Sequence, residues 1–201
     1  MSFFENTRKP EGFGGKLMVA MMNLGHSPVA RWGLRFLALT PDAKVLDCGC
    51  GGGANIKRLL KKSPEGIVKG IDYSPVSVEK SKKVNEAAIA EGRCAVLQGS
   101  VVNMIFAGDW FDAVTAFETV YFWPDLPQCF REVYRVLKPG GTFLICNESN
   151  GDTDKDEKWT EIIGGMTIYK DTELKTYLEQ AGFHDVQIHK KKSWLCITAW
   201  K

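Results

Sequence analysis

The chain has 201 residues, of which 44% are hydrophobic and 25% are charged, and its formal net charge at pH 7 is +2. This length and composition predict one globular unit and exclude a disordered tail, a collagen-like repeat and a disulfide-dense mini-protein. The near-neutral charge argues against a nucleic-acid partner, because nucleic-acid binding usually requires a concentrated basic surface.

The six cysteines are spread along the chain, and most of them lie in apolar runs. None forms a C-x-x-C pair and no clustered histidines accompany them, so the sequence predicts no metal site. Free thiols of this kind indicate a reducing compartment. No apolar stretch reaches the about 20 residues that a membrane span requires, and Met1–Gly15 lacks the apolar core of a signal peptide. These observations predict a cytoplasmic protein.

Two short helical patterns precede the first predicted strand. Lys16–Asn23 is apolar almost all round, and Ser27 with the following proline opens a second helix that continues through Trp32 and Leu37. Because neither pattern belongs to the sheet by its order in the chain, we expect residues 1–40 to form a helical cap outside the sheet core. This cap is expected near the ligand-binding edge of the domain that residues 41–201 form.

Five apolar runs separated by helical patterns follow, as is typical of a parallel sheet covered by helices on both faces. Two further strands end the chain, and the short lysine-rich turn between them requires that they run antiparallel. The predicted class is therefore α/β with a seven-stranded sheet. The predicted strands are Ala43–Cys48, Ile67–Asp72, Ala95–Gln98, Phe111–Phe117, Thr142–Cys146, Val186–His189 and Trp194–Trp200.

Capping residues mark two of the predicted helices. Ser74 is a suitable N-cap, Pro75 suits the first helical position, and Gly92 is expected to end that helix. Near the end of the chain a helix is expected from Asp171 or the next residue to Gly182.

The strongest chemical signal lies between Val45 and Ala54. A buried strand runs into a turn with four glycines among the five residues of Gly49–Gly53, and a helix follows. Glycines allow positive φ and leave no Cβ between the backbone and a ligand. In open parallel sheets such a turn lies at the carboxyl ends of the strands, where ligands bind. The pattern therefore predicts a ligand-binding loop.

The residues Gly49-x-Gly51-x-x-Ala54 also fit the dinucleotide-binding fingerprint, in which Asp72 would bind a ribose. Asp47 favours a different ligand, because a carboxylate in the crevice would repel a pyrophosphate and suits an ammonium group. S-adenosylmethionine carries an amino group, a sulfonium and a ribose, but no phosphate. A nicotinamide-dependent oxidoreductase remains the alternative.

Several segments together resemble class I S-adenosylmethionine-dependent methyltransferases of the small-molecule type. Asp47-x-Gly49-x-Gly51-x-Gly53 resembles their first motif, and the matches continue in order to about Ile145. The resemblance implies a Rossmann-like sheet of order 3-2-1-4-5-7-6 with the last strand antiparallel. The other matching segments are Gly70–Ser74, Gln98–Val101, Phe111–Asp125 and Arg131–Gly141.

The resemblance also implies S-adenosylmethionine as the cofactor and a role for each matching residue. The first motif would line the methionine part, Asp72 would bind both ribose hydroxyls, and Tyr73 would pack beside the adenine. Many relatives have Asp where this chain has Ser100, so the adenine contact departs from the family pattern there. The cofactor-binding residues so implied are Asp47, Gly49, Gly51, Gly53, Asp72, Tyr73, Ser100, Val101 and Phe117.

Methyl transfer requires positioning and exclusion of water, and it needs a general base only if the acceptor arrives protonated. The candidate bases are Glu118, Tyr121 and His26, each of which could equally have a structural role. Asn150–Glu157 is polar and is expected to be an exposed loop. Candidate walls of an acceptor pocket, or alternatively ordinary core residues, are Met18, Met22, Trp32, Trp123 and Trp159.

The sequence therefore predicts an enzyme that transfers a methyl group from S-adenosylmethionine to a small-molecule acceptor and releases S-adenosylhomocysteine. A methyltransferase acting on a macromolecule is the nearest alternative. An oxidoreductase and a protein that only binds the cofactor are the others.

Overall fold

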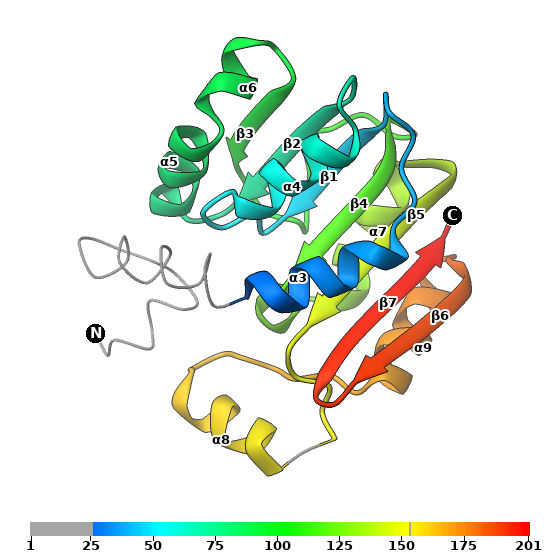
Figure 1. Ribbon diagram of the computed structural model, residues 1–201. Coiled ribbons are helices and arrows are strands. Elements are labelled where there is room, and N and C mark those ends of the chain that lie inside the picture. The colour runs from blue at the N-terminus through cyan, green and yellow to red at the C-terminus, as the bar shows by residue number, and fades with distance from the viewer. Residues whose placement is uncertain (1–25, 153) are drawn as a thin grey trace.

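The structure is a computed structural model, and it describes residues 26–152 and 154–201 (Figure 1). The expected helix at Lys16–Asn23, with Met18 and Met22, lies outside the described residues. Within the described part of the chain, no helix is both long and apolar enough to cross a bilayer.

Seven strands form one sheet in the order β3-β2-β1-β4-β5-β7-β6, which confirms the predicted order. The strands β1 to β5 are parallel, and β7 runs antiparallel to both of its neighbours. The strands are β1 Lys44–Cys48, β2 Ile67–Asp72, β3 Cys94–Gln98, β4 Phe111–Phe117, β5 Leu137–Asn147, β6 His184–Lys191 and β7 Trp194–Trp200.

Helices cover both faces of the sheet, with α3 and α4 on one face and α7 and α9 on the other (Figure 1). Each face has its own buried cluster, and the neighbouring residues Val45 and Leu46 of β1 belong to opposite clusters. Strands buried on both faces are mainly apolar, which explains the near-continuous apolar runs. The helices are α3 Ser27–Gly33, α4 Ala54–Lys62, α5 Pro75–Val84, α6 Glu86–Ala90, α7 Leu126–Val136, α8 Asp154–Ile162 and α9 Asp171–Gln180, with 3₁₀ turns at Leu34–Phe36 and Val120–Phe122.

The helix expected from Ser74 to Gly92 is interrupted, which corrects the prediction of a single helix. It divides at Asn85 into α5 and α6. The buried Asn85 side chain donates hydrogen bonds to the carbonyl oxygens of Gly53 (3.1 Å) and Ser81 (2.9 Å). Asn85, at the break between the two helices, therefore links this segment to the glycine loop.

The segment expected to be an exposed loop, Asn150–Glu157, is partly helical and partly buried. Helix α8 begins at Asp154, and the side chain of Asp156 accepts a hydrogen bond from the N–H of Gly151 at 3.1 Å. Asn150 is also buried, and its side chain accepts the N–H of Asp152 at 3.0 Å. Local hydrogen bonds thus organise a segment whose composition alone indicated a loop.

Helix α3 belongs to the sheet core, so the expectation that this helix lies outside the core is wrong. Val29 and Ala30 are buried in the same cluster as Cys146 of β5 and Cys196 of β7. The helix packs against β5 so closely that a Cβ at Gly33 would overlap the Cys146 sulfur.

Replacing Gly33 with alanine should lower the free energy of unfolding by about 1–3 kcal/mol, the usual cost of overpacking a filled core. The backbone of Gly33 is right-handed helical, so the penalty is steric and not conformational. Urea unfolding would measure the loss. Gly164→Ala is the matched control, because a Cβ there meets nothing within 4 Å. Equal stability of the two variants would contradict the close packing of α3 on β5.

Candidate active site

A cavity of about 300 Å³ lies at the carboxyl ends of the parallel strands. The loops that follow β1, β2, β3 and β4 line it, together with the first residues of α3 and α4. The lining residues are His26, Val29, Ala30, Gly49, Cys50, Gly51, Gly52, Ala54, Asn55, Arg58, Ile71, Asp72, Tyr73, Ser77, Gly99, Ser100, Val101, Phe117, Glu118, Thr119, Phe122, Trp123 and Pro124.

The glycines of the first motif are required for different steric reasons. All three have positive φ, from +50° to +79°. A Cβ on Gly49 would overlap the Thr119 side chain, and one on Gly53 would lie 2.9 Å from the Cα of Ser81. A Cβ on Gly51 would meet no protein atom within 4 Å, although Gly51 lines the cavity. Gly51 therefore leaves room on the cavity side for a ligand to approach the backbone.

Asp72 lies at the end of β2 on the cavity wall. Its carboxylate accepts hydrogen bonds from the N–H of Gly51 (2.8 Å) and of Ser74 (2.9 Å). Burial raises the pKa of Asp72. Each carboxylate oxygen has a second lone pair, so the group remains able to accept hydroxyl donors from a ribose.

Asp47 does not line the cavity, which differs from its predicted place beside the methionine part. Its side chain is 2% exposed and accepts a hydrogen bond from the Thr115 hydroxyl at 2.7 Å. Asp47 and Thr115 are partners in the β1–β4 pairing. Desolvation raises the pKa of Asp47 to about 7, and the nearby negative charge of Asp72 adds to the rise. The carboxylate of Asp47 is therefore held inside the sheet by Thr115, apart from the described residues that line the cavity.

The side of the cavity expected to take adenine combines apolar walls with polar edges. Val101 and Ile71 supply the apolar surface, and Tyr73 is 40% exposed beside them. The Ser100 hydroxyl accepts a hydrogen bond from the N–H of Val102 at 3.3 Å, which is a contact within the turn that follows β3. Ser100 also lines the cavity.

Arg58 is a cavity residue that the motif analysis missed. Its guanidinium donates to the side chains of Asn55 and Ser27, both at 2.6 Å, and so joins the start of α3 to α4. A spacing of four residues places Arg58 on the same helix face as Ala54, which also lines the cavity. This helical spacing after the glycine loop could have revealed it.

The other end of the cavity is aromatic. Phe117, Phe122 and Trp123 line it, and the Trp123 indole N–H donates to the Thr119 hydroxyl at 3.2 Å. Tyr121 is not among the described lining residues. Its hydroxyl accepts the N–H of Ser149 at 2.9 Å and donates to the Ser149 carbonyl oxygen at 3.3 Å, so Tyr121 braces the chain after β5.

Two predicted pocket walls lie elsewhere among the described residues. Trp32 packs against Phe36 and Trp194, with ring centroids 5.3 and 5.8 Å away. Trp159 lies on α8 and is 43% exposed. Neither lines the cavity, so Trp123 is the member of the predicted tryptophan set that the structure places there.

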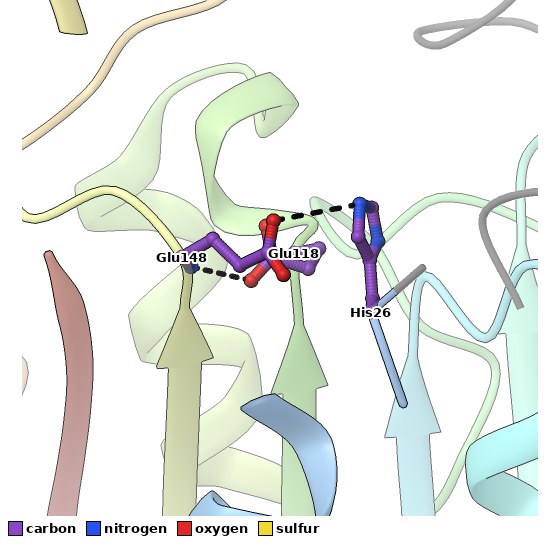
Figure 2. Close-up of side chains that lie close together, drawn as sticks. All are labelled: His26, Glu118 and Glu148. Atoms are coloured by element: carbon purple, nitrogen blue, oxygen red, sulfur yellow. Dashed lines mark hydrogen bonds and ion pairs between the residues drawn. The ribbon is translucent and has the colours of Figure 1, made fainter. Parts of the chain in front are cut away.

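Three titratable side chains come together beyond the ends of β4 and β5 (Figure 2), and two of them, His26 and Glu118, line the cavity. Glu118 follows β4, Glu148 follows β5, and His26 precedes α3. Glu118 Oε1 accepts the backbone N–H of Glu148 at 2.5 Å, and His26 Nε2 lies 4.0 Å from Glu148 Oε2. Burial raises the pKa of Glu118 well above its usual range, with a further rise from the charge of Glu148, and burial lowers the pKa of His26. No motif or spacing in the sequence predicted that Glu148 would lie at this site.

The described residues fit S-adenosylmethionine. The open backbone at Gly51, the carboxylate of Asp72 and the apolar wall at Val101 suit a methionine chain, a ribose and an adenine, respectively. Arg58 also lines the cavity, and its positive charge would suit the amino-acid carboxylate.

Comparisons with known proteins identify the family. Residues 46–145, about half of the chain, match the family model described as a methyltransferase domain. The protein named cycloartenol-C-24-methyltransferase from Arabidopsis thaliana is 32% identical over 156 residues, covering 73% of this chain and 46% of that protein. The chain spans less than half the length of the curated relatives that it matches.

Solved structures show the same fold. Haemonchus contortus phosphoethanolamine N-methyltransferase 2, in complex with phosphomonomethylethanolamine and S-adenosylhomocysteine, aligns with a TM-score of 0.80 at 14% identity, covering 100% of this chain and 61% of that chain. The [4+2]-cyclase SpnF aligns with a TM-score of 0.72 at 17% identity, covering 87% and 80%. Because the family match spans the ordered motifs and the glycine loop with its acidic partner at Asp72 lines the cavity, the chain belongs to the class I S-adenosylmethionine-dependent methyltransferases.

Proposed function

We propose that the chain transfers a methyl group from S-adenosylmethionine to a small, largely apolar acceptor. The observation that carries the proposal is the division of one cavity into a polar end, at Gly51 and Asp72, and an aromatic end, at Phe117, Phe122 and Trp123. The polar end suits the cofactor. The aromatic end suits an acceptor with apolar or aromatic surface.

The names of the curated relatives support an acceptor of this class. They are sterol and cycloartenol methyltransferases that act at carbon 24. The family match and these relatives favour methyl transfer over the oxidoreductase alternative. A macromolecular acceptor would have to present a group small enough to enter a cavity of about 300 Å³.

The chain's own residues position the reactants and exclude water. Bound S-adenosylmethionine supplies a methyl group that its sulfonium already activates. The Asp72 carboxylate and the open backbone at Gly51 orient the ribose and methionine chain, which fixes the direction of the methyl group. Phe122 and Trp123 provide a dry wall beside it. Tyr121 holds this wall in place through its two hydrogen bonds with Ser149.

S-adenosylhomocysteine should raise the melting temperature of the protein, whereas NAD and NADP should not. A ligand that binds only the native state at 100 times its Kd adds about 2.7 kcal/mol of stability. Differential scanning fluorimetry with all three ligands measures the effect. A shift with NAD and none with S-adenosylhomocysteine would overturn the methyl-transfer proposal.

Assays with radiolabelled S-adenosylmethionine identify the acceptor class. Sterols, phenols, thiols, amines, a protein mixture and total RNA serve as parallel acceptors. Label transferred to a small apolar or aromatic acceptor supports the proposal. Label transferred only to protein or RNA would contradict the small-molecule assignment while leaving the cofactor assignment intact.

A further inference from the structure

The cluster formed by His26, Glu118 and Glu148 has the composition and geometry of a cation site. One ligand atom from each side chain, an imidazole nitrogen and two carboxylate oxygens, lies within 4.8 Å of the other two. Figure 2 shows the two carboxylates and the imidazole directed toward one another above the ends of β4 and β5. The three residues are far apart in sequence, so only the fold brings them together.

The three ligand atoms lie farther apart than they would around one bound ion. Zinc and similar ions bind imidazole nitrogen and carboxylate oxygen at about 2.0–2.2 Å. Neighbouring ligand atoms of such an ion are therefore about 3–3.5 Å apart. The His26–Glu148 separation of 4.0 Å exceeds this range by a small amount.

The backbone at the cluster is held by the surrounding fold. Glu118 has a positive φ of 56° at the point where β4 ends, a conformation that non-glycine residues adopt rarely. Its carboxylate also accepts the N–H of Glu148 at 2.5 Å, which ties the exits of β4 and β5 together. On the other side, the carbonyl oxygen of His26 accepts the N–H of Ala30 in the first turn of α3. The three ligand-bearing positions are therefore preorganised.

The charges at the cluster favour a cation. Two carboxylates this close repel each other unless a proton or a cation lies between them. Within residues 26–152 and 154–201, neither Glu118 nor Glu148 forms an ion pair with lysine or arginine, and the imidazole of His26 is the ion-pairing partner of Glu148. A divalent ion would balance both charges and use the imidazole as a neutral ligand.

We propose that His26, Glu118 and Glu148 bind one divalent transition-metal ion, such as Zn²⁺ or Mn²⁺, at the aromatic end of the cavity. The mixed nitrogen and oxygen donors suit these ions better than Mg²⁺ or Ca²⁺, which prefer all-oxygen sites. Three protein ligands leave coordination positions open. Because His26 and Glu118 line the cavity, these positions face the space assigned to the acceptor.

The consequence for catalysis rests on the proposed function, whereas metal binding itself does not. A cation with open positions lowers the pKa of a hydroxyl group that binds it. The site would therefore favour acceptors that present an oxygen toward Glu118 and His26. An acceptor that supplies two neighbouring oxygens would be favoured further, because it could chelate the ion.

The test uses the full chain after a chelator has removed bound metal. One sample is titrated with Mn²⁺, and binding is followed by electron paramagnetic resonance. A second sample is titrated with Zn²⁺, and binding is followed by competition with a chromophoric chelator. One equivalent of each ion should bind. Glu148→Gln should weaken binding at least tenfold. It should retain the stabilisation by S-adenosylhomocysteine, because Glu148 is not among the described lining residues of the cavity. Glu118→Gln should weaken metal binding by a similar factor.

His184→Asn is the matched control, because His184 forms a similar but exposed pair with Asp185 at 2.8 Å. It should leave metal affinity unchanged. Absence of stoichiometric binding, or equal affinity in the wild type and the Glu118→Gln/Glu148→Gln double variant, would overturn the metal proposal. Stabilisation by S-adenosylhomocysteine without metal binding would leave the proposed function standing. Metal binding without stabilisation by S-adenosylhomocysteine would support the metal site and contradict the proposed function.

Discussion

Replacing Asp72 with alanine should lower the affinity for S-adenosylhomocysteine at least tenfold while the sheet remains folded. A hydrogen bond to a charged group contributes about 1.5–3 kcal/mol, and each 1.4 kcal/mol corresponds to about a tenfold change in affinity. The variant also loses the acceptor for the N–H of Gly51 and of Ser74. Isothermal titration calorimetry measures the total effect.

A 2′-deoxy analogue of S-adenosylhomocysteine separates the ribose contact from the loop contact. If Asp72 binds the ribose hydroxyls, the wild type should bind the analogue more weakly than it binds S-adenosylhomocysteine. The Asp72→Ala variant should bind the two ligands with about equal affinity. Asp112→Ala is the matched control, because Asp112 also accepts a backbone N–H, that of Lys44 at 2.8 Å, and does not line the cavity. Equal losses for the analogue in the wild type and in Asp72→Ala would assign the ribose to another residue.

Replacing Asp47 with asparagine should remove a large part of the pH dependence of stability. The pKa of Asp47 rises from 3.8 to about 7 on folding. Between these values the native state holds a proton that the unfolded chain has released, so stability falls as the pH rises through this window. A rise of three units corresponds to about 4 kcal/mol. As the pH rises from 4 to 8, the free energy of unfolding of Asp47→Asn should increase by about 2–4 kcal/mol relative to that of the wild type.

Urea unfolding at several pH values measures this difference. Thr115→Val provides a second check, because the Thr115 hydroxyl lowers the pKa of Asp47. Its loss should raise the pKa of Asp47 in the folded protein further and so extend the pH-dependent decline to higher pH. A constant difference between Asp47→Asn and the wild type across the range would mean that Asp47 does not carry a raised pKa.

The central strands of the sheet were predictable because they are buried on both faces. The predicted ranges Phe111–Phe117 and Trp194–Trp200 match β4 and β7 at both ends, and most residues of these two strands are buried, whichever face of the sheet they point to. The glycine loop was predictable for a related reason. Positive φ at Gly49, Gly51 and Gly53 favours glycine, and a run of glycines is visible without a structure.

Features that depend on contacts between distant segments were not predictable. The helix break at Asn85 follows from a hydrogen bond to Gly53, which is 32 residues away. The place of α3 in the core follows from its packing on β5. Glu148 follows a strand exit and has no distinctive neighbours, so only the fold shows that it meets His26 and Glu118.

The pairing of β1 with β4 also constrains the order in which the chain can fold. Asp47 and Thr115 are 68 residues apart, and closing so long a loop is costly before the neighbouring contacts form. A partly folded chain containing only β1, α4 and β2 would have the glycine loop but not the part of the cavity that the residues after β4 line. We therefore expect tight cofactor binding only after the central strands have paired. Cofactor binding should therefore slow unfolding and leave the folding rate almost unchanged.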